Sequence, residues 1–569
     1  MRTMALMIDL NVHYAESAQR FLQTAIVIDD QAMMGPVETI VPVKLETPTG
    51  SLFGAEPDPE PQAAIGIAVE ERSAPSSATL NAKILSQAFL DQRMICGLYR
   101  PDVGEDRVSR ASGAAGAADI VVVDWHLETG NSRPAKEIIL RILQNDFEAK
   151  GRLRLIAIYT SQAGREAIAT ELLAELEHNK VLQGRFTRDG SDIGNTSTRI
   201  VVLNKRTTPE AADRDEVVEE RLPERLITEF AKLSEGVVPS FALASVAAVR
   251  QGAHHVLSQY TANLDGAFIA HRCGIPHPDD SKSFAVDLIT SELRNLIEVE
   301  NVAEQTLNDE VAEAWLQAKI DRGDTFRTDR ADVPADRVLG FVRGGSVAVK
   351  ESAEHQTGFN NPDGKLGKDH KVTTGTLARV FYPTAAAARD GVQQLARLST
   401  FQREPHRTRS PQDWAPKLAL GTVVQQIADG VSGAILLCVQ PRCDSVRLSQ
   451  PTAFPFQTAG GEGQFNLVVR DAAGVDHQTW VNLKPRDAVM IRFIPHPERC
   501  AVFARPDPET GRFVFEAEDN MAFVWLGDLI AMKAQRWVSE LGSRVQGVGM
   551  DELEWLRQAG EGKIRAGWT

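Results

Sequence analysis

The sequence predicts an α/β protein that starts with a doubly wound, five-stranded parallel sheet and continues into a helical region and a C-terminal β-rich module. Three observations support this fold class. Short apolar runs alternate with helix-like segments up to about residue 210, apolar residues recur at helical spacing over residues 222–322, and strand-like runs separated by Gly, Pro and Asp turns follow over residues 377–526. Because 569 residues exceed what one hydrophobic core usually serves, we expect about three domains.

The parallel sheet is predicted from five runs of apolar or small residues, which are typical of strands buried on both faces. These runs are residues 24–28, 95–99, 120–123, 155–158 and 200–203. The helices predicted between them cover residues 80–92, 107–118, 135–148 and 164–179. Such alternation is typical of a flavodoxin-like sheet, in which the carboxyl ends of the strands share one edge and hold the ligands.

The predicted domain boundaries follow changes in composition. The expected domains are an α/β domain at 1–210, a helical region at 211–330 and a β-rich module with a terminal helix at 331–569. A Pro-, Glu- and Ser-rich stretch at about 36–77 predicts a mobile insertion after the first strand. Residues 323–376 are polar and Gly- and Asp-rich, which predicts loops with one short hairpin.

Composition limits the classes of partner. The chain carries 77 acidic against 62 basic residues, a formal net charge of −15, and this balance opposes a broad nucleic-acid-binding face. Five scattered cysteines predict reduced thiols in a cytoplasmic protein rather than a disulfide framework. The N-terminus has no apolar run of signal-peptide length, and no stretch approaches the ~20 apolar residues that span a bilayer, so no membrane partner is expected.

Polar side chains follow four of the five predicted strands, and they are the candidate site. Asp29 and Asp30 follow the first strand, Asp124 the third, Thr160 the fourth and Lys205 the fifth. In a doubly wound sheet these positions meet at one edge. Three crowded carboxylates repel one another unless a cation lies among them, and a hard divalent ion with oxygen ligands, Mg²⁺, meets that demand.

This set of residues suits phosphoryl transfer. Asp124 ends the central strand, and we therefore expect its carboxylate to attack a phosphorus atom in line. Phosphoryl transfer requires mainly positioning and charge neutralisation, which the ion and Lys205 would supply, with Thr160 adding a hydroxyl donor. The resulting acyl phosphate would change the local charge and reorder nearby loops.

The N-terminal part resembles the receiver domain of two-component response regulators. Four segments occur in the family's order: Ile26-Val-Ile-Asp-Asp30, Val122-Val-Asp-Trp-His-Leu127, Ile156-Ala-Ile-Tyr-Thr-Ser161 and Val201-Val-Leu-Asn-Lys205. The resemblance implies that Asp124 is phosphorylated by a phosphohistidine of a sensor histidine kinase. It also implies that Asp30, Asp124 and the backbone carbonyl of His126 bind Mg²⁺, with Asp29 acting largely through water, and that Thr160 and Lys205 contact the phosphoryl group.

Several positions depart from the family pattern. An aromatic residue often stands three residues before the lysine as a packing switch, but here that position is Val202, and Arg206 replaces the proline that normally follows the lysine. The gap between Thr160 and Lys205 is also long and predicts an extra loop at residues 184–198. These departures favour a receiver that holds phosphate without the usual switching mechanism.

The large C-terminal part makes the chain similar to response regulators of bacterial conflict systems, including Detocs-like anti-phage two-component systems. The resemblance implies a signal receiver in a phosphorelay or a phosphate buffer, acting with a kinase and with a second response regulator or an effector protein. Two alternatives remain: a phosphorylation-independent scaffold or adaptor, and an enzyme of unknown class in the C-terminal half that uses Cys443 and Asp444.

Two weaker clusters have plainer interpretations. His271, Cys273 and His277 lack an obvious fourth zinc ligand nearby, so a loop with incidental side chains is expected. Cys438 and Cys443 lack the second pair of a structural zinc site, and Asp444 more often stabilises a turn than performs catalysis. Walker A, dinucleotide and nucleophile-elbow motifs do not occur in the sequence.

Overall fold

The computed structural model describes most of the chain and divides it into two compact units, Met1–Arg322 and Gly323–Thr569. The described residues are 8–32, 80–101, 106–205, 216–328, 332–354, 374–409, 411, 414–428, 431–460 and 465–545. The predicted insertion at 36–77 and the position of Arg206 lie outside the described residues. Among the described residues, no helix has the length and apolar character needed to cross a membrane.

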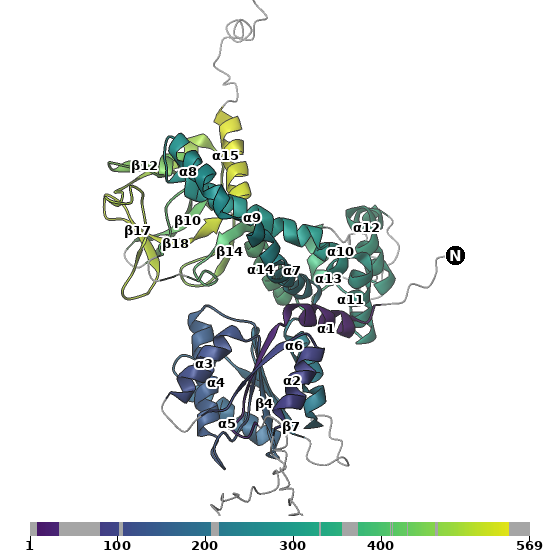
Figure 1. Ribbon diagram of the computed structural model, residues 1–569. Helices are drawn as coiled ribbons and strands as arrows, with labels where there is room; N and C mark the ends of the chain where they lie inside the picture. The colour runs from purple at the N-terminus through teal and green to yellow at the C-terminus, as the bar shows by residue number, and fades with distance from the viewer. Residues whose placement is uncertain are drawn as a thin grey trace, which may run out of the picture. The chain divides into compact units, whose positions relative to one another are not determined.

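The first unit is built on the predicted parallel sheet (Figure 1). Its parallel strands are β1 (Thr24–Ile28), β2 (Ile95–Tyr99), β3 (Ile120–Val123), β4 (Arg154–Thr160) and β7 (Thr198–Lys205). They lie in the order β2-β1-β3-β4-β7, which is the order of a flavodoxin-like sheet. All five strands coincide with predicted runs, so the fold class is confirmed for this unit.

The sheet is wider than expected. The predicted loop at 184–198 contains an antiparallel hairpin formed by β5 (Thr187–Asp189) and β6 (Asp192–Gly194), and β6 pairs with β7. Gly190 lies in the two-residue turn with φ +61°, a conformation that glycine adopts without strain. A short strand, β8 (Glu216–Val217), extends the other end of β7 in parallel. The hairpin therefore pairs with the edge of β7, whose backbone groups a loop would leave without strand partners.

Helices cover both faces of the sheet (Figure 1). One face packs against α3 (Arg107–Ala117), α4 (Arg133–Glu148) and α5 (Arg165–His178). The opposite face packs against α1 (Leu10–Phe21), α2 (Ala82–Asp91) and α6 (Leu222–Leu233). The four predicted helices α2 to α5 are confirmed, and α1 is an additional helix that the apolar spacing did not predict.

Helix α6 belongs to the core of the sheet. Its apolar stripe, predicted as the core of a separate helical region, consists of Leu222, Leu226 and Phe230, each 0% exposed. These side chains lie in one cluster with Leu155 and Leu203 of the sheet. The apolar surface of the second sheet face is therefore covered by residues beyond 210.

Most of the remaining helices of the first unit pack against α7, while α8 contacts α9. These helices are α7 (Val237–Gln259), α8 (Asp265–Gly274), α9 (Asp280–Val299), α10 (Val302–Thr306) and α11 (Asp309–Asp321), with 3-10 turns at Glu219–Arg221 and Ala262–Leu264. Helix α7 contacts α1, α9, α10 and α11. Arg250 of α7 donates to the carbonyl of Phe21 at 2.9 Å and to Asp119 at 3.1 Å. The expected helical region is thus anchored on the amino-terminal side of the sheet.

The second unit starts with three helices where loops and strands were expected. These are α12 (Ala335–Glu354), α13 (Thr374–Val380) and α14 (Ala385–Thr400). The loop-and-hairpin prediction for 323–376 agrees with the described residues before α12, where Arg327 and Asp332 form an antiparallel bridge, and is wrong for the helical residues from Ala335 on. The glycine pair that suggested a turn instead marks a kink, since Gly345 has φ +56° inside α12. Val338 and Phe341 of the same helix are buried. Helix α14 begins where Thr384 accepts a hydrogen bond from the Ala387 amide.

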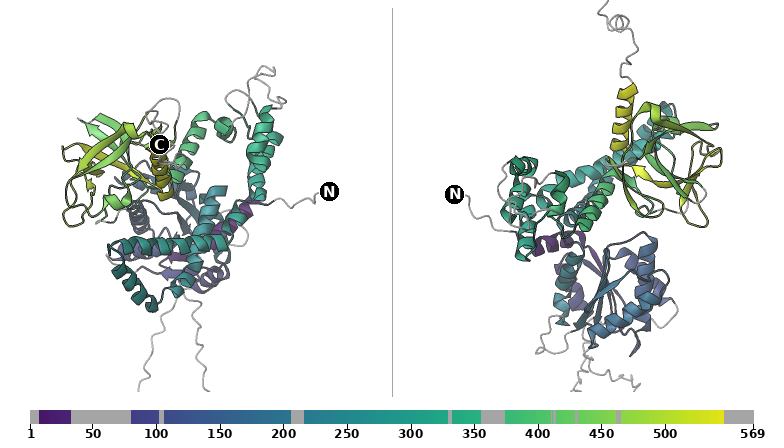
Figure 2. Two further views of the ribbon diagram at one scale, coloured as in Figure 1. Left: turned by 90° about the horizontal axis from the view of Figure 1, so that it is seen from above. Right: turned by 180° about the vertical axis from the view of Figure 1, so that it is seen from behind.

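The rest of the second unit is the predicted β-rich module, shown from behind in Figure 2. Its main sheet is antiparallel in the order β15-β12-β11-β10-β18-β17-β16, with β9 beside β18. These strands are β9 (Phe401–Arg403), β10 (Thr422–Ala428), β11 (Val431–Cys438), β12 (Thr452–Ala459), β15 (Ala488–Phe493), β16 (Arg505–Pro506), β17 (Phe513–Glu516) and β18 (Ala522–Leu529). A second sheet pairs β13 (Leu467–Arg470) with β14 (Asp476–Thr479), and α15 (Ala531–Val545) is the expected terminal helix.

Two apolar clusters stabilise this module. One packs the inner strand residues against α15 through Trp537. The other is rich in aromatic rings, with Phe454 and Phe456 of β12 next to Phe493 of β15 and Phe523 of β18. Burial of these side chains on both faces of the sheet stabilises the module, because each large aromatic side chain contributes about 2–3 kcal/mol when it is removed from water.

Candidate functional site

The candidate site lies at the carboxyl ends of the parallel strands, where the sequence predicts it. The backbone amide of Asp29 donates to the Tyr99 carbonyl at 3.2 Å, and that of Asp124 donates to the Ile28 carbonyl at 2.9 Å. These bonds continue the ladder one residue beyond the named strands. The strand pairing therefore holds the two carboxylates side by side at the sheet edge.

Lys205 lies between two of the carboxylates. Its Nζ is 2.8 Å from Asp29 Oδ2 and 2.7 Å from Asp124 Oδ2. All three residues are buried, with 2% of Asp29, 7% of Asp124 and 6% of Lys205 exposed. Two buried negative charges next to each other are unfavourable in a low-dielectric interior, so the ammonium group is needed to compensate them.

The third carboxylate completes a potential metal site. One oxygen each of Asp29, Asp30 and Asp124 lies within 4.8 Å of the others. Asp30 Oδ1 is buried and has no hydrogen-bond partner among the described residues. A buried acceptor without a partner is costly, and carboxylate oxygens are the ligands that Mg²⁺ prefers. The residues present therefore fit a hard divalent ion, and this is the one group of its kind in the described part of the chain.

The pKa values reflect the crowding of charge. Burial raises the pKa of Asp29, and Lys205 offsets only part of that effect. Burial and the neighbouring Asp124 raise the pKa of Asp30. For Lys205, burial opposes the charged form, but Asp29 and Asp124 together outweigh it and hold its pKa above the ordinary value. The pocket thus contains more negative charge than one ammonium group neutralises.

The other two expected site residues lie at the same edge. Thr160, the last residue of β4, is 1% exposed, and its hydroxyl accepts a hydrogen bond from the Gln162 amide at 3.2 Å. The backbone amide of His126 donates to Asp124 Oδ1 at 3.3 Å. This last bond orients the Asp124 side chain in the turn after β3.

Tyr159 contributes to the site and was missed by sequence reasoning. Its ring centroid is 5.7 Å from the ammonium of Lys205, and its hydroxyl donates to the Val217 carbonyl of β8 at 2.8 Å. Burial raises the pKa of the Tyr159 hydroxyl, so it remains a donor at neutral pH. The signal in the sequence was strand alternation: the residue next to Thr160 must face the opposite side of the sheet, which α6 covers.

The two weaker clusters do not form sites in the structure. His271, Cys273 and His277 are exposed, and the His271 ring packs against the Phe284 ring at 4.6 Å. Cys438 is fully buried in β11, and burial raises the pKa of its thiol to about 12, so it is a poor nucleophile. Cys443 and Asp444 lie exposed in a 3-10 turn (Arg442–Ser445).

Comparison with known proteins identifies one region. Residues 21–210 match the family model described as the response receiver domain. The match contains the parallel sheet and all five polar residues at its edge, and it covers about a third of the chain. No curated protein and no solved structure matches the chain. The N-terminal domain is therefore similar to response receiver domains.

Proposed function

We propose that Asp124 accepts a phosphoryl group from the phosphohistidine of a partner sensor kinase, as response receivers do. The observation that supports this most is the buried cluster in which Lys205 contacts both Asp29 and Asp124, inside the region that matches the receiver family. An Asp124 carboxylate oxygen attacks the phosphorus, the O–P bond forms, and the P–N bond to the imidazole breaks. The leaving imidazole takes a proton and becomes neutral histidine.

The neighbouring residues would prepare Asp124 for this step. Lys205 offsets the charge of the carboxylate before transfer and that of the acyl phosphate afterwards. Thr160 offers a hydroxyl at the same edge. Asp30, Asp124 and the backbone carbonyl of His126 would hold Mg²⁺, with Asp29 acting through water. When bound, the ion supplies charge neutralisation at the phosphoryl oxygens.

The primary test is phosphorylation with a small phosphodonor such as phosphoramidate in the presence of Mg²⁺. Intact-mass measurement should show one added phosphoryl group that is stable in acid and labile in base. Asp124→Asn should abolish the label, because an amide cannot form the acyl phosphate. Asp189→Asn serves as the matched control, since Asp189 is an exposed carboxylate of the same domain.

Two outcomes would contradict the proposal. A wild-type chain that takes up no label, with chelator and Mg²⁺ giving the same result, would remove the phospho-acceptor function. A label that survives in Asp124→Asn would place the acceptor elsewhere. Asp30→Asn tests the metal requirement separately: it should reduce labelling while leaving the Asp124 carboxylate in place.

We also propose that the domain acts in a phosphorelay as a receiver that stores phosphate, in the cytoplasm, in a defence system of the Detocs-like kind. Val202 supports storage over switching, because at 2% exposure it is packed in the sheet core and has no ring to change position. With a cognate kinase and a second regulator present, Asp124→Asn should increase phosphate on the second regulator. An unchanged level would exclude buffering.

A further inference from the structure

The second unit contains a polar cavity that the receiver chemistry does not use. Its volume is about 550 Å³, a size typical of small-molecule sites. Three segments line it: helix α14, the turn after β9, and the hairpin of β13 and β14. Six of its nine lining residues are Asp, Glu or Arg, so the lining is strongly charged.

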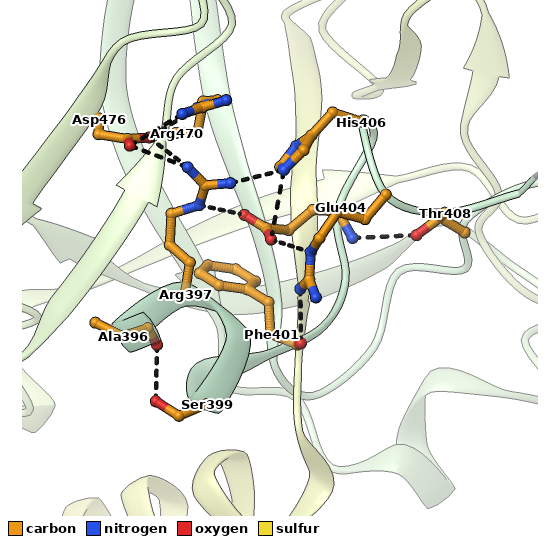
Figure 3. A network of polar contacts seen from close by, with 10 residues as sticks. Ala396, Arg397, Ser399, Phe401, Glu404, His406, Thr408, Arg470 and Asp476 are labelled. Atoms are coloured by element: carbon orange, nitrogen blue, oxygen red, sulfur yellow. Dashed lines mark hydrogen bonds and ion pairs between the residues drawn. The ribbon is translucent and has the colours of Figure 1, made fainter. Parts of the chain in front are cut away.

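Arg397 is the centre of this cavity wall (Figure 3). It comes from α14 and is 5% exposed. Its Nε donates to Glu404 Oε1 at 3.0 Å, and its Nη1 donates to both oxygens of Asp476 at 2.8 and 3.0 Å. Glu404 is itself 1% exposed. Such a fully paired buried guanidinium holds its neighbours in one fixed arrangement.

Two more arginines complete the pairing of the carboxylates. Arg407 Nε donates to Glu404 Oε2 at 2.6 Å. Arg470 donates to both oxygens of Asp476 at 2.8 and 3.0 Å, because the two residues are register partners in β13 and β14. Every oxygen of Glu404 and Asp476 therefore accepts at least one arginine hydrogen bond.

Some N–H donors of Arg407 and Arg470 are not used in these ion pairs. The Nη1 atoms of Arg407 and Arg470 make no hydrogen bond to any described residue, and 30% and 39% of these side chains are exposed. The five paired charges, three guanidinium groups and two carboxylates, sum to one positive charge. The inner wall thus offers arginine hydrogen-bond donors, while the exposed Asp390 carboxylate at the same cavity brings the sum of the charged lining residues to zero.

His406 adds a further donor. Arg397 Nη2 lies 2.6 Å from His406 Nε2, and a guanidinium nitrogen only donates, so Nε2 must be the acceptor and the proton is on Nδ1. Burial lowers the pKa of His406, with Glu404 opposing and the nearby arginines Arg397, Arg470 and Arg407 adding to the effect. His406 is therefore a neutral Nδ1 donor at neutral pH.

We propose that this cavity binds a small molecule through a phosphate or carboxylate group, held by Arg407, Arg470 and His406. The oxyanion would accept from the nitrogen atoms that the internal pairs leave available, and planar guanidinium groups suit oxyanions of either kind. Exposed Gln394 and Asp390 of α14 line the same cavity and would contact the remainder of the ligand. The Asp390 carboxylate favours a ligand that also carries hydroxyl or amine donors.

The test is calorimetric titration of the full chain with three probes: inorganic phosphate, adenosine monophosphate and citrate. Saturable binding of any probe is expected, and comparison of the three separates a free phosphate ion, a phosphate ester and a carboxylate. Arg407→Gln should weaken the bound probe about tenfold, because one charge-assisted hydrogen bond is lost. Arg492→Gln is the control, since Arg492 is an exposed, ion-paired arginine on β15.

A second variant separates binding from folding. Leu398→Trp keeps every ion pair but fills part of the cavity, because Leu398 lines it and is 48% exposed. It should also weaken the probe about tenfold while circular dichroism stays that of the wild type. Absence of binding by all three probes at millimolar concentration overturns the proposal. Binding that neither Arg407→Gln nor Leu398→Trp changes overturns it as well.

Discussion

At the scale of single residues, the candidate site is defined by an imbalance of charge. Lys205 contacts Asp29 and Asp124 directly, while Asp30 has a buried oxygen without a partner among the described residues. Removing one member of a buried ion pair typically costs 3–5 kcal/mol because the remaining charge is uncompensated. The site therefore favours both a lysine in place and a further cation beside Asp30.

The raised pKa values of Asp29 and Asp30 predict how Mg²⁺ binding depends on pH. When the pKa of a carboxyl group is raised in the folded state, its protonated form favours folding. This stabilisation is complete below the unfolded-state pKa, here 3.8, and is lost as pH rises through the raised folded-state pKa. Mg²⁺ needs the ionised carboxylates and must compete with protons over this window. Mg²⁺ affinity should therefore increase with pH from about 4 and level off above the raised pKa values.

Calorimetric titrations with Mg²⁺ between about pH 4 and about pH 8 measure this dependence. Asp30→Asn should bind Mg²⁺ more weakly and with a shallower pH profile, since one competing proton site is removed. An affinity that is flat across this range in the wild type would show that these carboxylates are not the ligands.

At the scale of elements, helix α6 completes the hydrophobic core on one face of the sheet. Phe230 of α6 is 0% exposed, packs in the core of the second sheet face and stacks on Phe21 of α1 with ring centroids 5.8 Å apart. The same helix follows β8, which pairs with the Lys205 end of β7. A change in α6 therefore reaches both the core and the strand that carries the site lysine.

Phe230→Ala should lower the free energy of unfolding of the first unit by about 3–5 kcal/mol, because it leaves a cavity in a packed core. Denaturant unfolding followed by circular dichroism measures the change. Phe284→Ala in α9 is the matched control: Phe284 is 47% exposed, and its loss should cost well under half as much. Equal effects of the two variants would contradict the assignment of α6 to the sheet core.

At the scale of the whole molecule, the chain contains two compact units with separate proposed ligands. A ligand stabilises only the unit that binds it, by about 2.7 kcal/mol at a concentration a hundredfold above its dissociation constant. Scanning calorimetry should therefore show two transitions. Mg²⁺ with beryllofluoride should raise only the transition of the first unit, and this shift should be absent in Asp124→Asn.

The bound probe of the C-terminal cavity should raise only the other transition. Phe230→Ala identifies the transition of the first unit independently, because it lowers that one alone. A single transition that every ligand shifts as a whole would mean that the two units unfold together, and the separate assignments would then be wrong.

The sequence by itself determined the parallel sheet and the set of polar residues at its edge. Strands buried on both faces need continuous apolar runs, and the residues that end those runs have to meet at one edge of a parallel sheet. For that reason Asp29, Asp30, Asp124, Thr160 and Lys205 were identified by their positions alone. The β-rich character of the second unit was predicted from strand-like runs between Gly, Pro and Asp turns, but the aromatic strands β12 and β18 were not predicted individually.

Only the tertiary structure decided how the remaining segments are used. The apolar residues at helical spacing in α6 predict that this helix has an apolar face, but not which surface that face packs against. The kink at Gly345 shows that a glycine pair need not end a helix. The cavity around Arg397 joins residues from 390 to 476, and its pairing depends on strand register and helix docking. Such long-range contacts leave no periodic signal in the chain, and this is why the grouping of polar residues at the sheet edge was predicted and the cavity of the second unit was not.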